Sequence, residues 1–140
     1  MPDDVMFAKG AIIERCLRRV LEIYGDDPNL ADLLHLDALT LNVERACQAA
    51  IDLALHVVAV KHLGMPQSQA DAFRLLYEAG EIERELYEQM IAMCGFRNVL
   101  VHQYQKLDMD VLHAVASVRW KDFVELCHAV GLEIVVIAED

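Results

Sequence analysis

Residues 96–104 of this 140-residue chain read Phe96-Arg97-Asn98-Val99-Leu100-Val101-His102-Gln103-Tyr104. A helix turns by about 100° per residue, so Arg97 and Tyr104, seven positions apart, point in the same direction. Asn98 and His102, four positions apart, share a neighbouring direction, and Gly95 leaves open space on that side. The opposite side carries the apolar residues Phe96, Val99 and Leu100. The segment therefore predicts an amphipathic helix whose polar face gathers one cation, one titratable base and one hydroxyl, which indicates a functional site.

Apolar side chains at helical spacing predict four further helices, over about residues 4–24, 37–63, 68–79 and 109–130. The helix with the polar face is expected to begin near residue 81 and to end near Tyr104. Asp37 and Asp108 are predicted to cap the second and last helices, and Ser68 followed by Asp71 resembles a capping box for the third. The last helix is predicted to turn inward Val111, Leu112, Val115, Val118, Phe123, Leu126 and Val130, and to stop at Gly131. Residues 132–137 have β-branched character and predict an extended edge or part of an interface.

Length and composition indicate one helical domain over residues 1–140, with residues 132–140 as a tail whose structure the pattern leaves open. No apolar run reaches the roughly 18 residues that a membrane span needs, and the N-terminus lacks the basic segment of a secretory signal. A cytoplasmic protein is expected. The cysteines are widely scattered and are predicted to be buried thiols: Cys16, Cys47, Cys94 and Cys127. No recognised spacing of zinc ligands occurs, so no metal is expected.

The net charge of −11 argues against non-specific binding of nucleic acid, because such binding depends on neutralising phosphates. An acidic chain can still act on RNA where positive charge is local. The arginines that offer such charge, besides Arg97, are Arg15, Arg18, Arg19 and Arg45. For the first three, a solvated face balanced by neighbouring glutamates is an equally open interpretation.

Polar residues form one stripe along the second predicted helix, at Asn42, Arg45, Gln48, Asp52 and His56. One interpretation is an internal hydrogen-bonded network, because buried polar groups need partners. The other is that Arg45 and its neighbours form the far wall of a cleft that faces Arg97. The sequence leaves both open.

The pattern Arg97-x-x-x-x-His102-x-Tyr104 resembles the signature of HEPN domains, and most closely the HepT-type toxin family. Residues 41–54 look like that family's second helix, residues 64–68 with Phe73 look like its following turn and short helix, and residues 15–25 are similar to its opening helix. The resemblance covers most of residues 5–130 and has no counterpart for residues 132–137. It implies an all-α fold, an antiparallel bundle of about five helices that forms a homodimer.

The residue types of the site suit RNA cleavage without a metal or another cofactor. The ribose 2′-hydroxyl is the nucleophile, and His102 can take or give a proton near neutral pH. Arg97 can bind the phosphate oxygens through two parallel hydrogen bonds. Asn98 can orient the imidazole or a phosphate, and Tyr104 can donate a hydrogen bond or stack on a base. One histidine supplies only one of two proton-transfer roles, and the source of the second stays open, with a two-fold dimer as one answer.

The resemblance implies an endoribonuclease toxin of a type VII-like toxin–antitoxin pair. Its antitoxin would be a minimal nucleotidyltransferase that neutralises the toxin by adenylylating the motif tyrosine, Tyr104. Two alternatives belong to other classes. One is a non-catalytic helical subunit that presents nucleotide or substrate to such a nucleotidyltransferase, and the other is a plain dimeric structural bundle.

Overall fold

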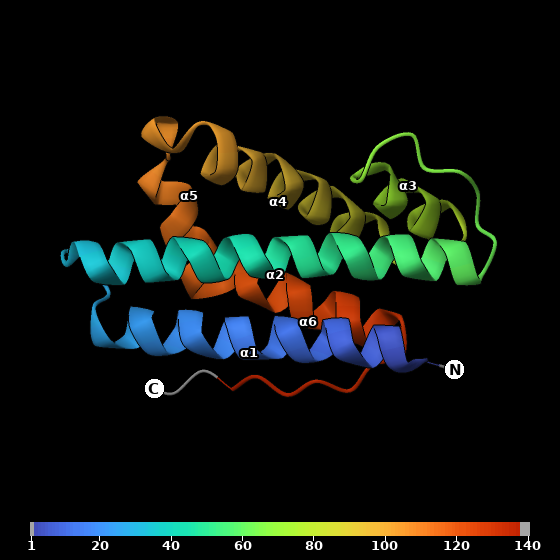
Figure 1. Cartoon of the computed structure of the whole chain (residues 1–140), viewed down its shortest axis with the longest axis horizontal. Coiled ribbons are helices and arrows are strands. Elements are labelled where there is room, and N and C mark those ends of the chain that lie inside the picture. The colour runs from blue at the N-terminus through green and yellow to red at the C-terminus, as the bar shows by residue number, and fades with distance from the viewer. Residues whose placement is uncertain (1, 138–140) are drawn as a thin grey trace.

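Two long antiparallel helices, α1 (Asp4–Asp26) and α2 (Leu33–Val60), run side by side through the computed structural model, which describes residues 2–137 (Figure 1). Asp3 starts α1 by accepting a hydrogen bond from the backbone N–H of Met6 at 3.0 Å. Its other carboxylate oxygen lies 2.7 Å from Nε2 of His56, near the far end of α2. This contact joins the start of α1 to the end of α2, as their antiparallel arrangement requires.

The remaining helices cover these two. They are α3 (Asp71–Glu78), α4 (Arg84–His102), the 3₁₀ turn η1 (Tyr104–Lys106), α5 (Met109–Ala114), the π turn η2 (Val115–Arg119) and α6 (Trp120–Ala129). In Figure 1, α4 lies along one side of α2 and α1 along the other, and α6 contacts all three of these helices. Residues 2–137 contain helices and no strand, so the predicted all-α bundle is confirmed.

The core lies between these helices and is closed by large side chains such as Phe73 of α3 and Phe123 of α6, which are both completely buried. Replacing a buried phenylalanine by alanine typically costs about 3–5 kcal/mol. None of the helices within residues 2–137 has both the length and the apolar character that a membrane crossing requires.

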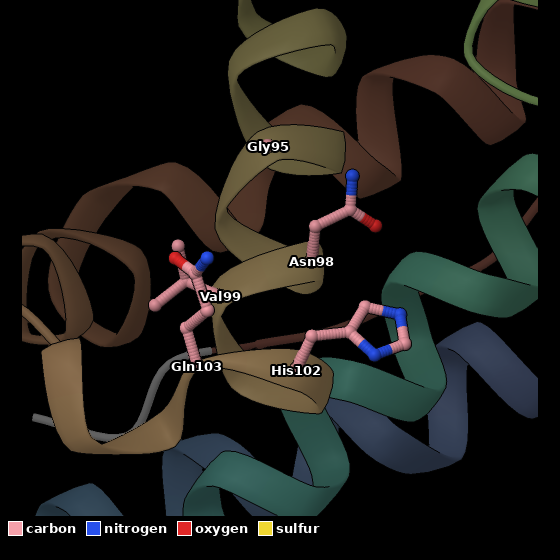
Figure 2. Close-up of a pocket in the computed structure, with 5 residues that line it drawn as sticks. All are labelled: Gly95, Asn98, Val99, His102 and Gln103. Atoms are coloured by element: carbon pink, nitrogen blue, oxygen red, sulfur yellow. The ribbon is translucent and has the colours of Figure 1, made fainter.

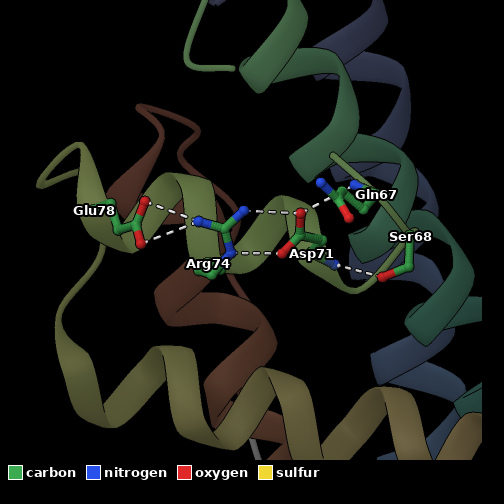
Figure 3. A network of polar contacts seen from close by, with 5 residues as sticks. All are labelled: Gln67, Ser68, Asp71, Arg74 and Glu78. Atoms are coloured by element: carbon green, nitrogen blue, oxygen red, sulfur yellow. Dashed lines mark hydrogen bonds and ion pairs between the residues drawn. The ribbon is translucent and has the colours of Figure 1, made fainter. Parts of the chain in front are cut away.

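The short helix α3 begins with the predicted capping pattern in a modified form (Figure 3). Ser68 Oγ accepts a hydrogen bond from the Asp71 N–H at 3.2 Å, while Asp71 Oδ2 accepts one from the Gln67 N–H at 3.0 Å. Arg74 Nε donates to Asp71 Oδ1 at 2.6 Å, and its guanidinium also reaches Glu78. The Arg74 hydrogen bond holds the pKa of the Asp71 carboxyl well below its usual range, at about 2.

The second helix begins four residues before its predicted start. Asp32, and not Asp37, caps α2: its Oδ1 accepts a hydrogen bond from the Leu34 N–H at 2.8 Å. The prediction for Asp37 is wrong because Leu33 and Leu34 extend the helix although both are exposed to solvent. The Asp37 carboxylate is therefore free for another partner. Asp108, in contrast, caps α5 as predicted, through the Asp110 N–H at 2.9 Å.

The last predicted helix is one helical run, α5–η2–α6, and Gly131 ends it with a φ of +95°. Five of its seven predicted inward residues are buried, but Val111 and Val118 are 39% and 51% exposed. Val111 and Val118 are seven positions apart and therefore share one face of the run, which is turned to solvent. The prediction missed Ala116 and Trp120, which take inward positions instead.

Residues 132–137 run as an extended strap along α1 (Figure 1). Leu132 and Ile134 are buried against α1, where a Cβ on Gly10 would lie only 3.0 Å from Leu132 Cδ1. The Val135 N–H donates to Glu14 Oε1 at 3.0 Å, and Arg18 Nη2 donates to the Val135 carbonyl at 3.2 Å. The predicted extended conformation is present, but the strap packs on a helix. The rest of the predicted tail, residues 138–140, lies outside the described residues.

Candidate active site at the end of helix α4

An open hollow of about 440 Å³ lies on the exposed side of α4, close to its C-terminus. Its lining residues are Gly95, Asn98, Val99, His102 and Gln103 (Figure 2). A Cβ added to Gly95 would meet nothing within 4 Å, so this part of the helix surface is accessible to another molecule. Val99 was predicted on the apolar side, but it is only half-buried and lines the hollow.

His102 is the last residue of α4, and its side chain is exposed. Figure 2 shows its ring on the same side of the helix as the Asn98 amide. Within residues 2–137 the imidazole has no hydrogen-bond partner, so both ring nitrogens are available to a substrate or to another chain. An accessible imidazole of this kind can act as a general acid or base.

Arg97 is half-buried and close enough to Cys47 of α2 to act on its thiol, and it is not among the residues that line the hollow. Burial raises the pKa of the Cys94 thiol to about 11, and the nearby Arg97 guanidinium opposes that rise. Arg97 Nη1 donates to Asn98 Oδ1 at 3.3 Å. Its Nε is buried and has no partner among the residues that the structure describes. An unpaired buried donor costs roughly 1–3 kcal/mol, so an anionic ligand that reached this guanidinium would gain by pairing it.

Tyr104 lies outside α4, which ends two residues earlier than predicted. Gln103 breaks the helix with φ −139° and ψ 44°, and Tyr104 opens the 3₁₀ turn η1. The prediction that Arg97 and Tyr104 point in one direction along a single helix is therefore wrong. The Tyr104 hydroxyl donates to Asp37 Oδ1 of α2 at 3.4 Å, and the residue is 41% exposed.

The polar stripe on α2 is mostly engaged with α1. Gln48 Nε2 donates to Asp52 Oδ1 at 2.9 Å, Lys9 Nζ pairs with Asp52 Oδ2 at 3.1 Å, and His56 contacts Asp3. These contacts fit the interpretation as a hydrogen-bonded network. Asn42 is buried, and its Nδ2 donates to the Ala38 carbonyl at 2.8 Å.

The predicted contact arginines fall into two groups. Three of them, Arg15, Arg19 and Arg45, are exposed and form no ion pair within residues 2–137. They surround the buried Cys16 thiol, where α1 meets α2: burial raises the pKa of this thiol, and the positive charge of the three arginines opposes that rise. Arg18 points instead to the strap and pairs with Glu14 at 3.6 Å. Arg45 thus lies on the α1 side of α2 and does not line the hollow beside Arg97.

The structure therefore brings Asn98 and His102 together in one hollow and joins Arg97 to them through Asn98. It places Tyr104 apart, beside Asp37, whose sequence context instead predicts a helix cap. A carboxylate one turn inside a helix gives no signal in the sequence that it faces a tyrosine 67 positions later. No group of three or more His, Cys, Asp or Glu side chains that could hold a metal occurs in the described part of the chain.

Comparison with known proteins identifies relatives of this arrangement. The family model described as "Ribonuclease HepT-like" matches residues 13–130. A Shewanella oneidensis protein named mRNA nuclease HepT is 35% identical over 132 residues, which cover 94% of this chain and 99% of that protein.

Two solved structures share the fold over nearly the whole chain. One is a tri-AMPylated Shewanella oneidensis HEPN toxin in complex with an MNT antitoxin, with a TM-score of 0.87, 35% identity, and coverage of 92% of this chain and 98% of that chain. The other is a toxin–antitoxin structure with AMP-PNP, with a TM-score of 0.86, 34% identity, and coverage of 91% and 98%. With a matching family model, a curated relative of nearly equal length and the same fold, the chain belongs to the HepT-like ribonuclease family.

Proposed function

We propose that this chain is a metal-independent endoribonuclease that acts as the toxin of a toxin–antitoxin pair in the cytoplasm. The observation that carries the proposal is the exposed His102 imidazole, which shares an open hollow with Asn98 at the end of the helix that holds Arg97. Identity of 35% to a protein named an mRNA nuclease supports the same activity.

The reaction that these groups can perform is an internal transesterification. The ribose 2′-oxygen attacks the neighbouring phosphorus, the new 2′-oxygen–phosphorus bond forms, and the bond from phosphorus to the 5′-oxygen breaks. His102 removes the proton from the 2′-hydroxyl or delivers one to the leaving 5′-oxygen. Arg97 binds the non-bridging oxygens, where negative charge builds up in the transition state, and Asn98 keeps the guanidinium in place through its amide oxygen.

A homodimer would complete the site, because each chain offers one histidine in the hollow and the reaction needs two proton-transfer groups. Two copies packed through α4 would bring a second His102 to the cleft. The open surface at Gly95 supports this packing. So do Ile91 and Val101, apolar residues of α4 that are 37% and 38% exposed.

The test of the proposed activity is cleavage of total RNA by the purified chain in the presence of EDTA. Cleavage under these conditions, with growth arrest when the chain is expressed alone, is the expected result. A well-folded chain that leaves RNA intact but binds a nucleotidyltransferase would instead support a non-catalytic partner subunit.

The shared site has its own test. A mixture of Arg97→Ala and His102→Ala chains distinguishes how the two chains share the site. If one site draws Arg97 from one chain and His102 from the other, mixed dimers should regain part of the activity that each variant loses. If the reaction needs both copies of His102, the mixed dimers should stay inactive. Light scattering that shows a monomer at micromolar concentration would contradict the dimer.

The antitoxin in this proposal is a minimal nucleotidyltransferase that transfers AMP to Tyr104. The S. oneidensis relative is an AMPylated toxin in complex with an MNT antitoxin, which supports a partner of this class. Tyr104 is 41% exposed and stands on a turn after the end of α4, so a second enzyme can reach its hydroxyl. The attached phosphate would compete with RNA for Arg97, because an arginine pairs with either phosphate in the same way.

Arg15, Arg19 and Arg45 are proposed as contacts to RNA phosphates outside the hollow, with Arg18 as a weaker candidate because it is engaged with the strap. Replacing Arg45 by glutamine should weaken RNA binding uniformly across sequences and reduce the salt slope by about 1. Arg84→Gln is the matched control, because Arg84 is exposed and paired with Glu88 within its own helix.

A further inference from the structure

The Asp37 carboxylate forms one hydrogen bond in the described part of the chain, and its partner is the Tyr104 hydroxyl. Asp32 takes the capping role at the start of α2, so Asp37 has no helix N–H to serve. No lysine or arginine within residues 2–137 forms an ion pair with it. Its Oδ1 accepts the Tyr104 hydroxyl from 3.4 Å, across 67 positions of sequence.

The local backbone holds the tyrosine at this carboxylate. The α4 helix ends at His102, and η1 is closed by the Lys106 N–H to the Gln103 carbonyl at 2.7 Å. The Leu107 N–H donates to the Tyr104 carbonyl at 3.0 Å, and the partly buried Leu107 side chain packs on the core. The turn is therefore anchored on both sides of Tyr104, while the phenol itself stays exposed.

We propose that Asp37 is a catalytic residue for the adenylylation of this chain's own Tyr104, as the group that accepts the phenol proton. The proposal rests on the function proposed above, in which a nucleotidyltransferase modifies Tyr104. A carboxylate beside an attacking hydroxyl removes the proton that otherwise makes the phenol a poor nucleophile. The separation of 3.4 Å lies at the outer limit of a hydrogen bond, and such contacts tighten when the reacting complex forms.

In the transfer step, Tyr104 Oη attacks the α-phosphorus of ATP, and the oxygen–phosphorus bond of the tyrosine ester forms. The bond between the α-phosphorus and the bridging oxygen of the pyrophosphate group breaks, and pyrophosphate leaves with the electron pair. The phenol proton passes to the Asp37 carboxylate and then to water. In this scheme the toxin supplies both the nucleophile and its base, and the transferase supplies the bound nucleotide.

The experiment measures AMP incorporation by intact mass, with the full-length chain, its cognate minimal nucleotidyltransferase and ATP. Asp37→Asn should slow the transfer by roughly 10²-fold, through kcat and with little change in the KM for the toxin chain. Its rate should also rise more steeply with pH than that of the wild type, because without the carboxylate no group of the toxin removes the phenol proton during attack, and the reaction depends on hydroxide to do so. Asp37→Glu should restore part of the rate.

Asp110→Asn is the matched control, because Asp110 is an exposed carboxylate after the same turn and, within residues 2–137, its side chain forms no hydrogen bond with Tyr104. It removes the same charge and should be modified at the wild-type rate, with circular dichroism confirming that both variants are folded. Modification of Asp37→Asn at the wild-type rate, with an unchanged pH profile, would overturn the role of Asp37 alone. If the wild-type chain gains no AMP from an active transferase, the proposed modification of Tyr104 fails, and the role of Asp37 fails with it.

Discussion

Replacing His102 by alanine should remove RNA cleavage and leave folding intact. The imidazole is exposed, stands on the last residue of α4, and has no hydrogen-bond partner within residues 2–137. Substitutions at such surface positions usually change the free energy of unfolding by no more than about 0.5 kcal/mol. For a chain of this size that corresponds to a shift in Tm of about 1–3 °C. Leu100, two residues earlier, is buried, and its replacement by alanine should cost about 2–5 kcal/mol.

The expected loss of activity is much larger than this change in stability. Removing a general acid or base typically slows a reaction by roughly 10²–10⁴-fold. At about 1.36 kcal/mol per factor of ten, this corresponds to roughly 2.7–5.4 kcal/mol of transition-state stabilisation. The His102→Ala chain should therefore lose most of its activity while its Tm stays close to that of the wild type.

The assay compares initial rates of RNA cleavage with thermal melts of the same preparations. Gln103→Ala is the matched control, because Gln103 is the next residue, is exposed and lines the same hollow. It should keep most of the activity. Cleavage at the wild-type rate by a folded His102→Ala chain would refute the assignment, and an equal loss in Gln103→Ala would show that the surface of the hollow, and not the imidazole, was being measured.

Four further predictions follow from single features of the structure. Arg97→Lys should restore little of the cleavage that Arg97→Ala removes, because an ammonium cannot form two parallel hydrogen bonds to phosphate. A cleavage rate near that of the wild type would contradict this. Tyr104→Phe should gain no AMP and should stay toxic when the antitoxin is co-expressed, as intact mass and growth curves would show. Because the pKa of Asp71 is about 2 in the folded chain and about 3.9 in an unfolded one, its contribution to stability is complete above about pH 4 and is lost as the pH falls towards 2. Asp71→Asn should lack this part of the acid-unfolding profile. The four cysteines are buried, and burial raises their pKa values, so native protein should resist alkylation at pH 8, whereas rapid labelling without denaturant would contradict that burial.

The helices could be predicted from the sequence to a large extent, because each buries an apolar face that recurs at the helical period. The residues at which the helices begin and end were harder to predict. Asp32 and Asp37 both stand before apolar residues, and only the structure shows that α2 begins at the exposed Leu33. The inward face of the last helical run was also harder to predict, since Val118 is exposed while Ala116 and Trp120 are buried. The π turn η2 was hidden too, because one extra residue in a helical turn leaves no mark in composition.

For the candidate site, local spacing was informative only as far as the helix continues. Asn98 and His102 share a hollow, as their spacing of four predicts, because both precede the end of α4. Tyr104 follows that end, so its direction is decided by η1 and by Asp37 and not by helical periodicity. A contact between residues 67 positions apart depends on tertiary packing, which no local pattern encodes.

In the proposed inhibition, the AMP group would be attached covalently to Tyr104 on its own short turn, and this attachment would determine how long the toxin stays inactive. An AMP group attached there is a ligand on a short tether, so its effective concentration near Arg97 would be on the order of millimolar whatever the amount of free nucleotide. Competing RNA would have to exceed that local concentration to displace it. Silencing by a tethered nucleotide would therefore persist after the antitoxin dissociates, and one transferase molecule could inactivate many toxin chains in succession.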